Sequence, residues 1–192
     1  MVANPVFSET PKESQKAELT SLEDFLLHPP EYTEWVDGKL IEKNGMTFKH
    51  GVAQSRLDYH WRTYMNSSGQ GGELCTETLC RTERQARRPD VAYVTAELLE
   101  EVGEFRVFPQ SFPLIVEVAS PEDSAEPLFA KAGEYMESGC LEVWLLFPEA
   151  GIILINTQQG WLLRNFEEVV STQTVLTGFS TPVKELLVWT RD

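Results

Sequence analysis

One short apolar segment constrains the fold of this chain more than any other. Residues 114–119 read Leu-Ile-Val-Glu-Val-Ala, a run that is apolar on both faces, as a strand in the middle of a covered sheet is. Glu117 lies inside this run. Burying an unpaired ionised carboxylate costs several kcal/mol, so such a residue has a cation, a metal ion or a shifted pKa. The segment therefore predicts a buried strand in which Glu117 is either a salt-bridged structural acid or part of a metal or acid–base site.

Helical and strand-like patterns alternate along the rest of the chain. An Asp-Gly pair at positions 37 and 38 separates two strand-like runs and predicts a hairpin. Apolar residues at three- and four-residue spacing predict helices over residues 50–66 and 125–138, the second ended by Gly139. Thr20 or Ser21 would cap a short first helix. Strand-like segments complete an α/β pattern; they cover residues 74–82, 90–95, 141–147, 151–156 and 161–166.

Length and charge restrict the class of protein. The 192 residues fit one domain, which we expect over residues 19–192 after a flexible arm over residues 1–18. Sixteen Lys and Arg face thirty Asp and Glu, a net charge of −14, which argues against coating nucleic acid or membrane through the overall field. We find no targeting or membrane segment and no disulfide framework among the three cysteines. These features predict a cytoplasmic protein without a membrane partner.

Asp90 and Lys131 could share a site with Glu117. Asp90 stands where the segment over residues 90–95 begins, so it is an ordinary loop or cap residue unless that strand lies beside the one carrying Glu117. Two acids at one end of a sheet would suit a hard cation such as Mg²⁺. Lys131 lies on or beside the apolar stripe of the second helix. It is either a snorkelling surface lysine or a group that orients water or stabilises a phosphate.

A cluster of arginines precedes Asp90. Four of the sixteen basic residues occupy positions 81–88. They either form a solvated loop that offsets nearby acids, or a local patch that binds phosphate at the edge of the site. The candidate phosphate-binding residues are Arg84, Arg87 and Arg88.

Several motifs occur in a fixed order along the chain: Glu34 with the Asp37-Gly38 turn, Glu42, His50, Arg88-Pro89-Asp90, Val116-Glu117-Val118 followed by Ser120-Pro121, and Lys131 with Tyr135. No single piece is specific, but the ordered set resembles the Uma-two family, a branch of the PD-(D/E)XK nuclease superfamily. The resemblance covers residues 20–185. It implies a restriction-endonuclease-like fold, which is a mixed β-sheet flanked by helices with extra β-hairpins.

The resemblance also implies an activity, the Mg²⁺- or Mn²⁺-dependent hydrolysis of phosphodiester bonds in nucleic acid. The family label favours DNA, although nothing in the residues selects DNA over RNA. Asp90 and Glu117 match the two acids, and the Val118 carbonyl would add a third metal ligand. The superfamily places its lysine two residues after the second acid, where this chain has Ala119. Lys131 would then supply that charge from the helix.

Glu42 and His50 are candidate neighbours of this site. Glu42 flanks the hairpin turn and His50 opens the first long helix. Both positions also suit ordinary structural roles, Glu42 on the hairpin surface and His50 as a loop or capping residue.

Two other interpretations remain open. Ala119 and the acidic composition are compatible with a catalytically inactive nuclease fold that serves as an interaction or regulatory module. A structural homodimer is the second alternative, in which Glu117 would be a paired core acid. An exposed Trp144 or Trp161 would then belong to the contact between subunits.

Overall fold

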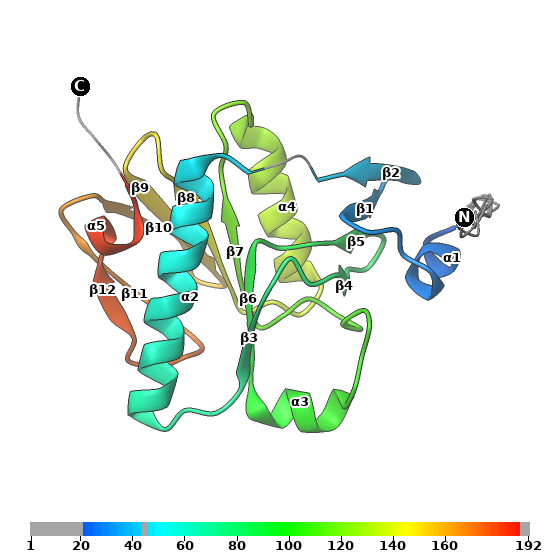
Figure 1. The fold of residues 1–192 in the computed structure, drawn as a ribbon, viewed down its shortest axis with the longest axis horizontal. Coiled ribbons are helices and arrows are strands. Elements are labelled where there is room, and N and C mark those ends of the chain that lie inside the picture. The colour runs from blue at the N-terminus through cyan, green and yellow to red at the C-terminus, as the bar shows by residue number, and fades with distance from the viewer. Residues whose placement is uncertain (1–20, 44–45, 189–192) are drawn as a thin grey trace, which may run out of the picture.

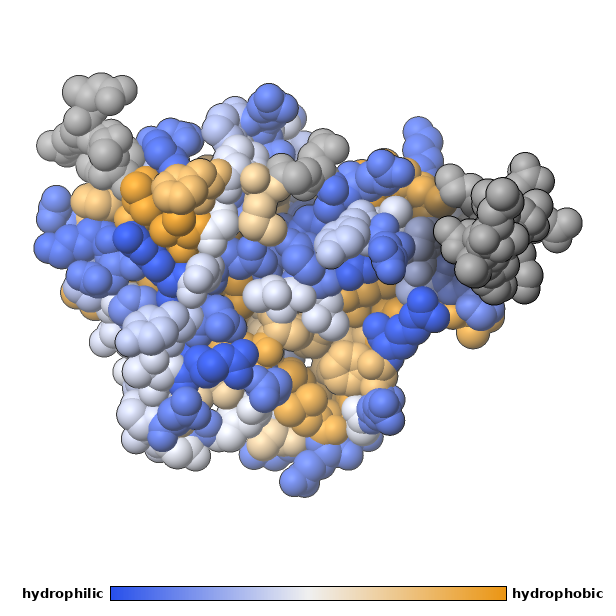
Figure 2. All heavy atoms as spheres, viewed as in Figure 1, coloured by the Kyte–Doolittle hydropathy of each residue, from blue (hydrophilic) through white to orange (hydrophobic). Residues whose placement is uncertain are grey.

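A computed structural model describes residues 21–43 and 46–188 (Figure 1). The arm predicted over residues 1–18 lies outside this range. On the face shown in Figure 2, hydrophobic surface forms separate patches among hydrophilic side chains. Within the described residues, no helix is both long and apolar enough to cross a membrane.

Six strands of the described chain form the main sheet, in the order β10-β9-β8-β7-β6-β3. β7 and β8 run parallel, whereas the other neighbouring strands are antiparallel. The sheet is therefore mixed, which confirms the fold that the family resemblance implied. The bounds of its strands are β3 (Glu73–Thr76), β6 (Val91–Val94), β7 (Leu114–Val118), β8 (Glu142–Phe147), β9 (Ile152–Thr157) and β10 (Gly160–Asn165).

Long helices cover both faces of the main sheet. Because side chains alternate along a strand, Val116 belongs to the same buried cluster as Trp61 of α2, while Ile115 clusters with Ala132 of α4. The same alternation puts Glu117 on the α4 face. α4 also makes the crossover between β7 and β8, the kind of connection that parallel strands need. The helix bounds are α2 (Phe48–Ser68) and α4 (Ala125–Glu137).

A smaller sheet lies beside the main one, with the described strands in the order β2-β1-β5-β4. The predicted hairpin is confirmed: Asp37 and Gly38 form its turn with φ values of 50° and 76°. The predicted first helix is confirmed as α1 (Leu22–Leu27), where Ser21 caps the amide of Asp24. The strand bounds are β1 (Thr33–Val36), β2 (Lys39–Glu42), β4 (Cys80–Arg81) and β5 (Ala86–Arg87).

The remaining described elements flank these sheets. They are α3 (Ala96–Val102), β11 (Val169–Ser171), β12 (Ser180–Pro182) and α5 (Val183–Leu186). β11 and β12 pair with each other in a short antiparallel ribbon.

Two expectations from the sequence are wrong. Residues 74–82 are not one strand: they divide into β3 of the main sheet and β4 of the small sheet. The chain changes direction between them, where Glu77 adopts a left-handed backbone conformation with φ of 53°. Trp144 is fully buried, in contact with the ring of Trp61, so it cannot form a subunit contact. Trp161 is 41% exposed and lies edge-on to Phe129.

Candidate active site

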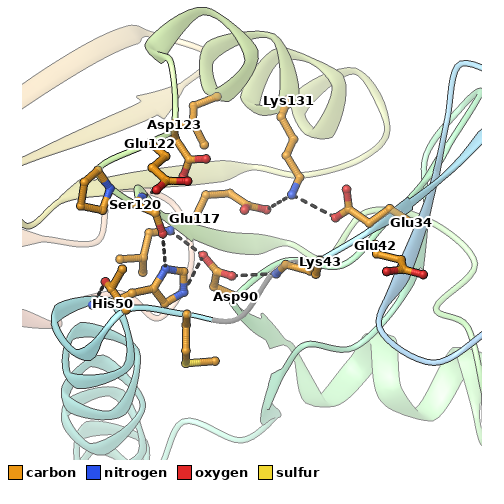
Figure 3. A pocket seen from close by; sticks show the side chains of 15 residues that line it. Glu34, Glu42, Lys43, His50, Asp90, Glu117, Ser120, Glu122, Asp123 and Lys131 are labelled. Atoms are coloured by element: carbon orange, nitrogen blue, oxygen red, sulfur yellow. Dashed lines mark hydrogen bonds and ion pairs between the residues drawn. The ribbon is translucent and has the colours of Figure 1, made fainter.

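A pocket of about 550 Å³ opens where β6 begins and β7 ends (Figure 3). The hairpin, the N-terminus of α2, the loop after β7 and α4 form its walls. Its described lining holds more carboxylates than cations. The acids are Glu34, Glu42, Asp90, Glu117, Glu122 and Asp123, and the basic groups are Lys43, His50 and Lys131.

The sheet register brings Asp90 and Glu117 together. Val91 pairs with Val116 in the antiparallel β6–β7 ladder, so Asp90, one residue earlier, stands opposite Glu117. Side chains directly opposite each other on antiparallel strands lie side by side. Asp90 is 2% exposed and Glu117 is 4% exposed. The pocket therefore contains two almost buried carboxyl groups at the same end of the sheet.

Asp90 is surrounded by groups that favour its charged form. Its Oδ1 accepts a 2.7 Å hydrogen bond from Lys43 Nζ, and its Oδ2 accepts a 2.6 Å bond from the Val118 amide. His50 Nε2 lies 3.4 Å from Oδ2, at an ion-pair distance but without hydrogen-bond geometry. Burial alone would raise the pKa of Asp90, but His50 and Lys43 outweigh it and hold the pKa far below its usual value.

The surroundings of Glu117, in contrast, favour the neutral form of its carboxyl group. Its Oε1 accepts a 2.8 Å hydrogen bond from the Tyr135 hydroxyl and lies 3.0 Å from Lys131 Nζ. Burial raises the pKa of Glu117 to about 7, with the charge of Asp90 adding to the increase and Lys131 opposing it. Near neutral pH this carboxyl group can therefore release or accept a proton.

Lys131 bridges two acids. Its Nζ lies 3.0 Å from Glu117 Oε1 and 3.0 Å from Glu34 Oε1. Burial by itself would lower the pKa of Lys131, but these carboxylates raise it well above its usual value. The lysine is thus a fixed positive charge, held beside Glu117 by α4.

The carboxylate oxygens of Asp90 and Glu117 and the carbonyl oxygen of Val118 are ligands of the kind that hard divalent cations prefer. The Val118 amide points to Asp90, and in a strand the carbonyl of a residue points to the same side as its amide. As the side chains stand, no three His, Cys, Asp or Glu of the described chain converge on a metal position. Lys43 and Lys131 each contact one of the two acids. The residues therefore fit a metal ion, provided that an ammonium group gives way.

The two candidate neighbours lie at this pocket. His50 contacts Asp90 as described, and its Nδ1 is 3.4 Å from the Ser120 hydroxyl. The charge of Asp90 outweighs the effect of burial and raises the pKa of His50. Glu42 lines the pocket from β2, where it is exposed.

The arginines that precede Asp90 have most of their contacts outside this pocket, although Arg87 Nη1 also lies 3.4 Å from Glu34 Oε2. Arg87 is tied to Glu134 by contacts of 2.6–3.1 Å, and Arg88 donates to the carbonyl of Glu77. Arg84 is exposed beside a separate hollow at α4. Arg84, Arg87 and Arg88 do not line the Asp90–Glu117 pocket as the described residues form it, and their phosphate-binding role stays a prediction.

Sequence reasoning missed several members of the site. Lys43 follows the hairpin, where no motif or periodicity singles out a lysine. Glu77 contacts Lys43 at 2.8 Å, but it reaches the site through a left-handed turn that the sequence does not signal. Tyr135 was named with Lys131 in the ordered set of motifs but was given no role, although its place four residues after Lys131 puts it on the same face of the helix.

The fold and this pocket of acids and lysines define a nuclease-like protein of the restriction-endonuclease class. The model of the Uma2 family, described as "Putative restriction endonuclease", matches residues 17–184. The chain belongs to this family.

A solved structure supports the fold independently. It is "a putative nuclease belonging to DUF820" from Anabaena variabilis, with a TM-score of 0.76. The two chains are 21% identical, and the match covers 86% of this chain and 96% of the other. No curated protein matches the chain.

Proposed function

We propose that this protein is a metal-dependent endonuclease that hydrolyses phosphodiester bonds in nucleic acid, with DNA as the substrate that its family description favours. The observation that carries the proposal is the convergence of Asp90, Glu117 and Lys131 in one pocket. Two acids and a lysine at one end of a sheet match the catalytic set of the PD-(D/E)XK superfamily.

The carboxylates of Asp90 and Glu117 and the carbonyl of Val118 would hold Mg²⁺ or Mn²⁺. A metal ion held there would stabilise negative charge on the phosphate and make water a better nucleophile. Six acids line the described pocket against two lysines and one histidine, so the protein groups by themselves would repel a phosphate. A divalent cation reduces that repulsion, which supports dependence of activity on a metal.

The chain's own groups would position the reactants. Lys131 is held between Glu117 and Glu34, where its ammonium can orient a water molecule and offset charge on the scissile phosphate. Glu117 is held in place by Tyr135 and Lys131, and a bound cation would favour the charged form that it needs as a ligand. His50 keeps Asp90 ionised from the other side of the pocket.

One observation favours a second candidate, a catalytically inactive module. Both oxygens of Asp90 already contact protein groups, and Glu117 is bound by Tyr135 and Lys131. A pocket neutralised in this way could persist without a metal. This alternative predicts that no divalent ion binds and that no nucleic acid is cleaved.

A cleavage assay distinguishes the two functions. Plasmid DNA, linear duplex, single-stranded DNA and RNA would each be incubated with Mg²⁺ or Mn²⁺ and the purified chain. We expect metal-dependent cleavage that falls by at least about 10²-fold in Asp90→Asn, Glu117→Gln and Lys131→Met, because each removes a charge from the reaction site. Glu100→Gln, an exposed change on α3, is the control that should retain activity. Cleavage that survives Glu117→Gln unchanged would contradict the proposal.

The state of assembly is a separate question. The expectation from the sequence is a cytoplasmic protein, with a homodimer as an alternative. Trp161 and Phe129 form an exposed aromatic pair that could contribute to a contact. Light scattering of the purified chain tests this expectation, and a monomeric mass at all concentrations would contradict it.

A further inference from the structure

Lys43 is the least expected cation in the pocket. It follows β2, and its Nζ donates to three oxygens: Glu77 Oε2 at 2.8 Å, the Arg88 carbonyl at 2.8 Å and Asp90 Oδ1 at 2.7 Å. These are the lengths of strong, charge-assisted hydrogen bonds. The three oxygens thus form a cage around one positive charge.

The cage includes an atom that a metal ion would need. Asp90 Oδ2 accepts a bond from the Val118 amide and Oδ1 accepts one from Lys43, so a cation bound at Oδ1 would compete with the ammonium. Lys131 contacts Glu117 and Glu34 instead. The two lysines therefore act on different acids, and Lys43 is the one placed at the metal-binding side of Asp90.

The geometry points to an exchange: we propose that Lys43 is an internal counter-ion of the metal site, which occupies Asp90 in the metal-free protein and is displaced when a divalent cation binds. This inference rests on the proposed function and adds a competing residue to it. A buried carboxylate without a cation is costly, so the lysine keeps Asp90 charged and the pocket folded. The same contact lowers the affinity for metal.

Displacement would leave the ammonium at the pocket wall. Glu77 and the Arg88 carbonyl would remain as partners on that side, and the side chain is already 20% exposed. A phosphate bound to the metal would then lie within the same pocket as a lysine released from Asp90. The exchange would therefore couple metal binding to the presentation of a positive charge to the substrate.

Chemical labelling of the unmodified chain tests the exchange without measuring activity. Lysines would be acylated with an amine-reactive ester, with and without saturating Mn²⁺, and the extent at each site read by peptide mass spectrometry. We expect Lys43 to be protected without metal and to label several-fold faster when Mn²⁺ is bound. Lys49, which pairs with Glu149 on the surface, should label equally in both. Mn²⁺ binding that leaves Lys43 as protected as before would overturn the inference.

A variant gives an independent measurement. Lys43→Met removes the competing charge and keeps the length of the side chain, so we expect its Mn²⁺ affinity, measured by electron paramagnetic resonance, to exceed that of the unmodified chain by about tenfold. Lys49→Met is the control for a general loss of positive charge and should change the affinity little.

Each outcome separates the two proposals. Equal affinities in the unmodified chain and Lys43→Met would overturn the exchange while leaving metal binding intact. Failure of both proteins to bind Mn²⁺ would instead overturn the proposed function, and the exchange with it.

Discussion

Two buried glutamates on neighbouring parallel strands have different surroundings. Glu117 lies in β7 and Glu142 begins β8, and both are almost inaccessible to solvent. Each belongs to a run of apolar residues. They differ in what surrounds the carboxylate, and this difference separates a structural acid from a functional one.

Glu142 is satisfied by neutral donors. Its Oε1 accepts a 2.6 Å hydrogen bond from the Trp144 indole, and its Oε2 accepts bonds from the amides of Gln173 and Thr174 and from the Thr174 hydroxyl, at 2.8–2.9 Å. Fixed donors of this kind stabilise a carboxylate without a counter-charge. Glu142 therefore anchors the segment between β11 and β12 to the main sheet.

Glu117 has one neutral donor, Tyr135, and one charged neighbour, Lys131. It faces a pocket rather than a packed loop. The comparison shows that a buried acid in an apolar strand does not by itself indicate a site. What distinguishes the site is that its carboxylates are balanced by charges that a ligand could replace.

The largest expected effect is on stability at Glu142. Glu142→Ala would leave the buried Trp144 indole without its acceptor, which costs about 1–3 kcal/mol. It would also remove the charged acceptor that holds the amides of Gln173 and Thr174 and the Thr174 hydroxyl. We expect the free energy of unfolding, measured in urea, to fall by at least about 3 kcal/mol. A loss below about 1 kcal/mol would show that Glu142 is not a structural anchor.

Glu117→Gln should have the opposite effect on stability. The folded chain holds a proton on Glu117 up to about pH 7, whereas the unfolded chain releases it near the ordinary value of 4.5. Stability therefore falls as the pH rises between these values. We expect Glu117→Gln to remove this loss, so that it is more stable than the unmodified chain by about 2 kcal/mol at pH 8 and nearly equal at pH 5.

The comparison at each pH must be made against the unmodified chain. His50 adds to the same slope, because its raised pKa also makes the folded chain lose stability as the pH rises. Equal pH dependence of unfolding in Glu117→Gln and the unmodified chain would contradict the raised pKa.

A smaller effect is expected at Tyr135. Tyr135→Phe removes the hydroxyl that donates to Glu117, which should cost about 1 kcal/mol of stability. Since the charged carboxylate loses a donor, the pKa of Glu117 should rise further. The pH dependence of unfolding would then extend to higher pH than in the unmodified chain. Tyr59→Phe, at an exposed position of α2, should change neither quantity.

The smallest effect is expected at Arg84, which is exposed. Arg84→Ala should change the free energy of unfolding by less than about 0.5 kcal/mol. If Arg84 contacts phosphate, the slope of log affinity for DNA against log salt should decrease in magnitude by about one. Lys184→Ala, an exposed change on α5, provides the control. An unchanged slope would assign Arg84 to a solvated loop.

Much of the fold was predictable because its signals are local. The hairpin at Asp37-Gly38 follows from turn chemistry, and α2 and α4 follow from helical periodicity. The division of residues 74–82 between two sheets was not predictable, because it depends on which strands are neighbours. Trp144 was misjudged for the same reason: its burial comes from contact with Trp61 and Phe179 of distant segments.

The site was predictable where a residue conflicts with its surroundings. Glu117 stands out in an apolar strand, and the positions of Asp90 and Lys131 made them candidates. The family resemblance then gave these residues their roles. Glu142 also belongs to an apolar run, but it is the first residue of its strand, where an acid is not unusual and predicts no site. The places of Lys43 and Glu77 in the site could not be predicted, because they depend on ion pairs between residues far apart in the sequence. Neither residue spacing nor composition indicates such pairs.

Binding of a divalent cation at Asp90 and Glu117 would be visible by anomalous diffraction from crystals soaked in Mn²⁺. We expect a peak within about 2.0–2.6 Å of carboxylate oxygens of Asp90 and Glu117, with the Lys43 ammonium moved away from Asp90 and no peak at Glu142. A well-ordered soaked structure with Lys43 still on Asp90 and no manganese beside Glu117 would show that no such site exists.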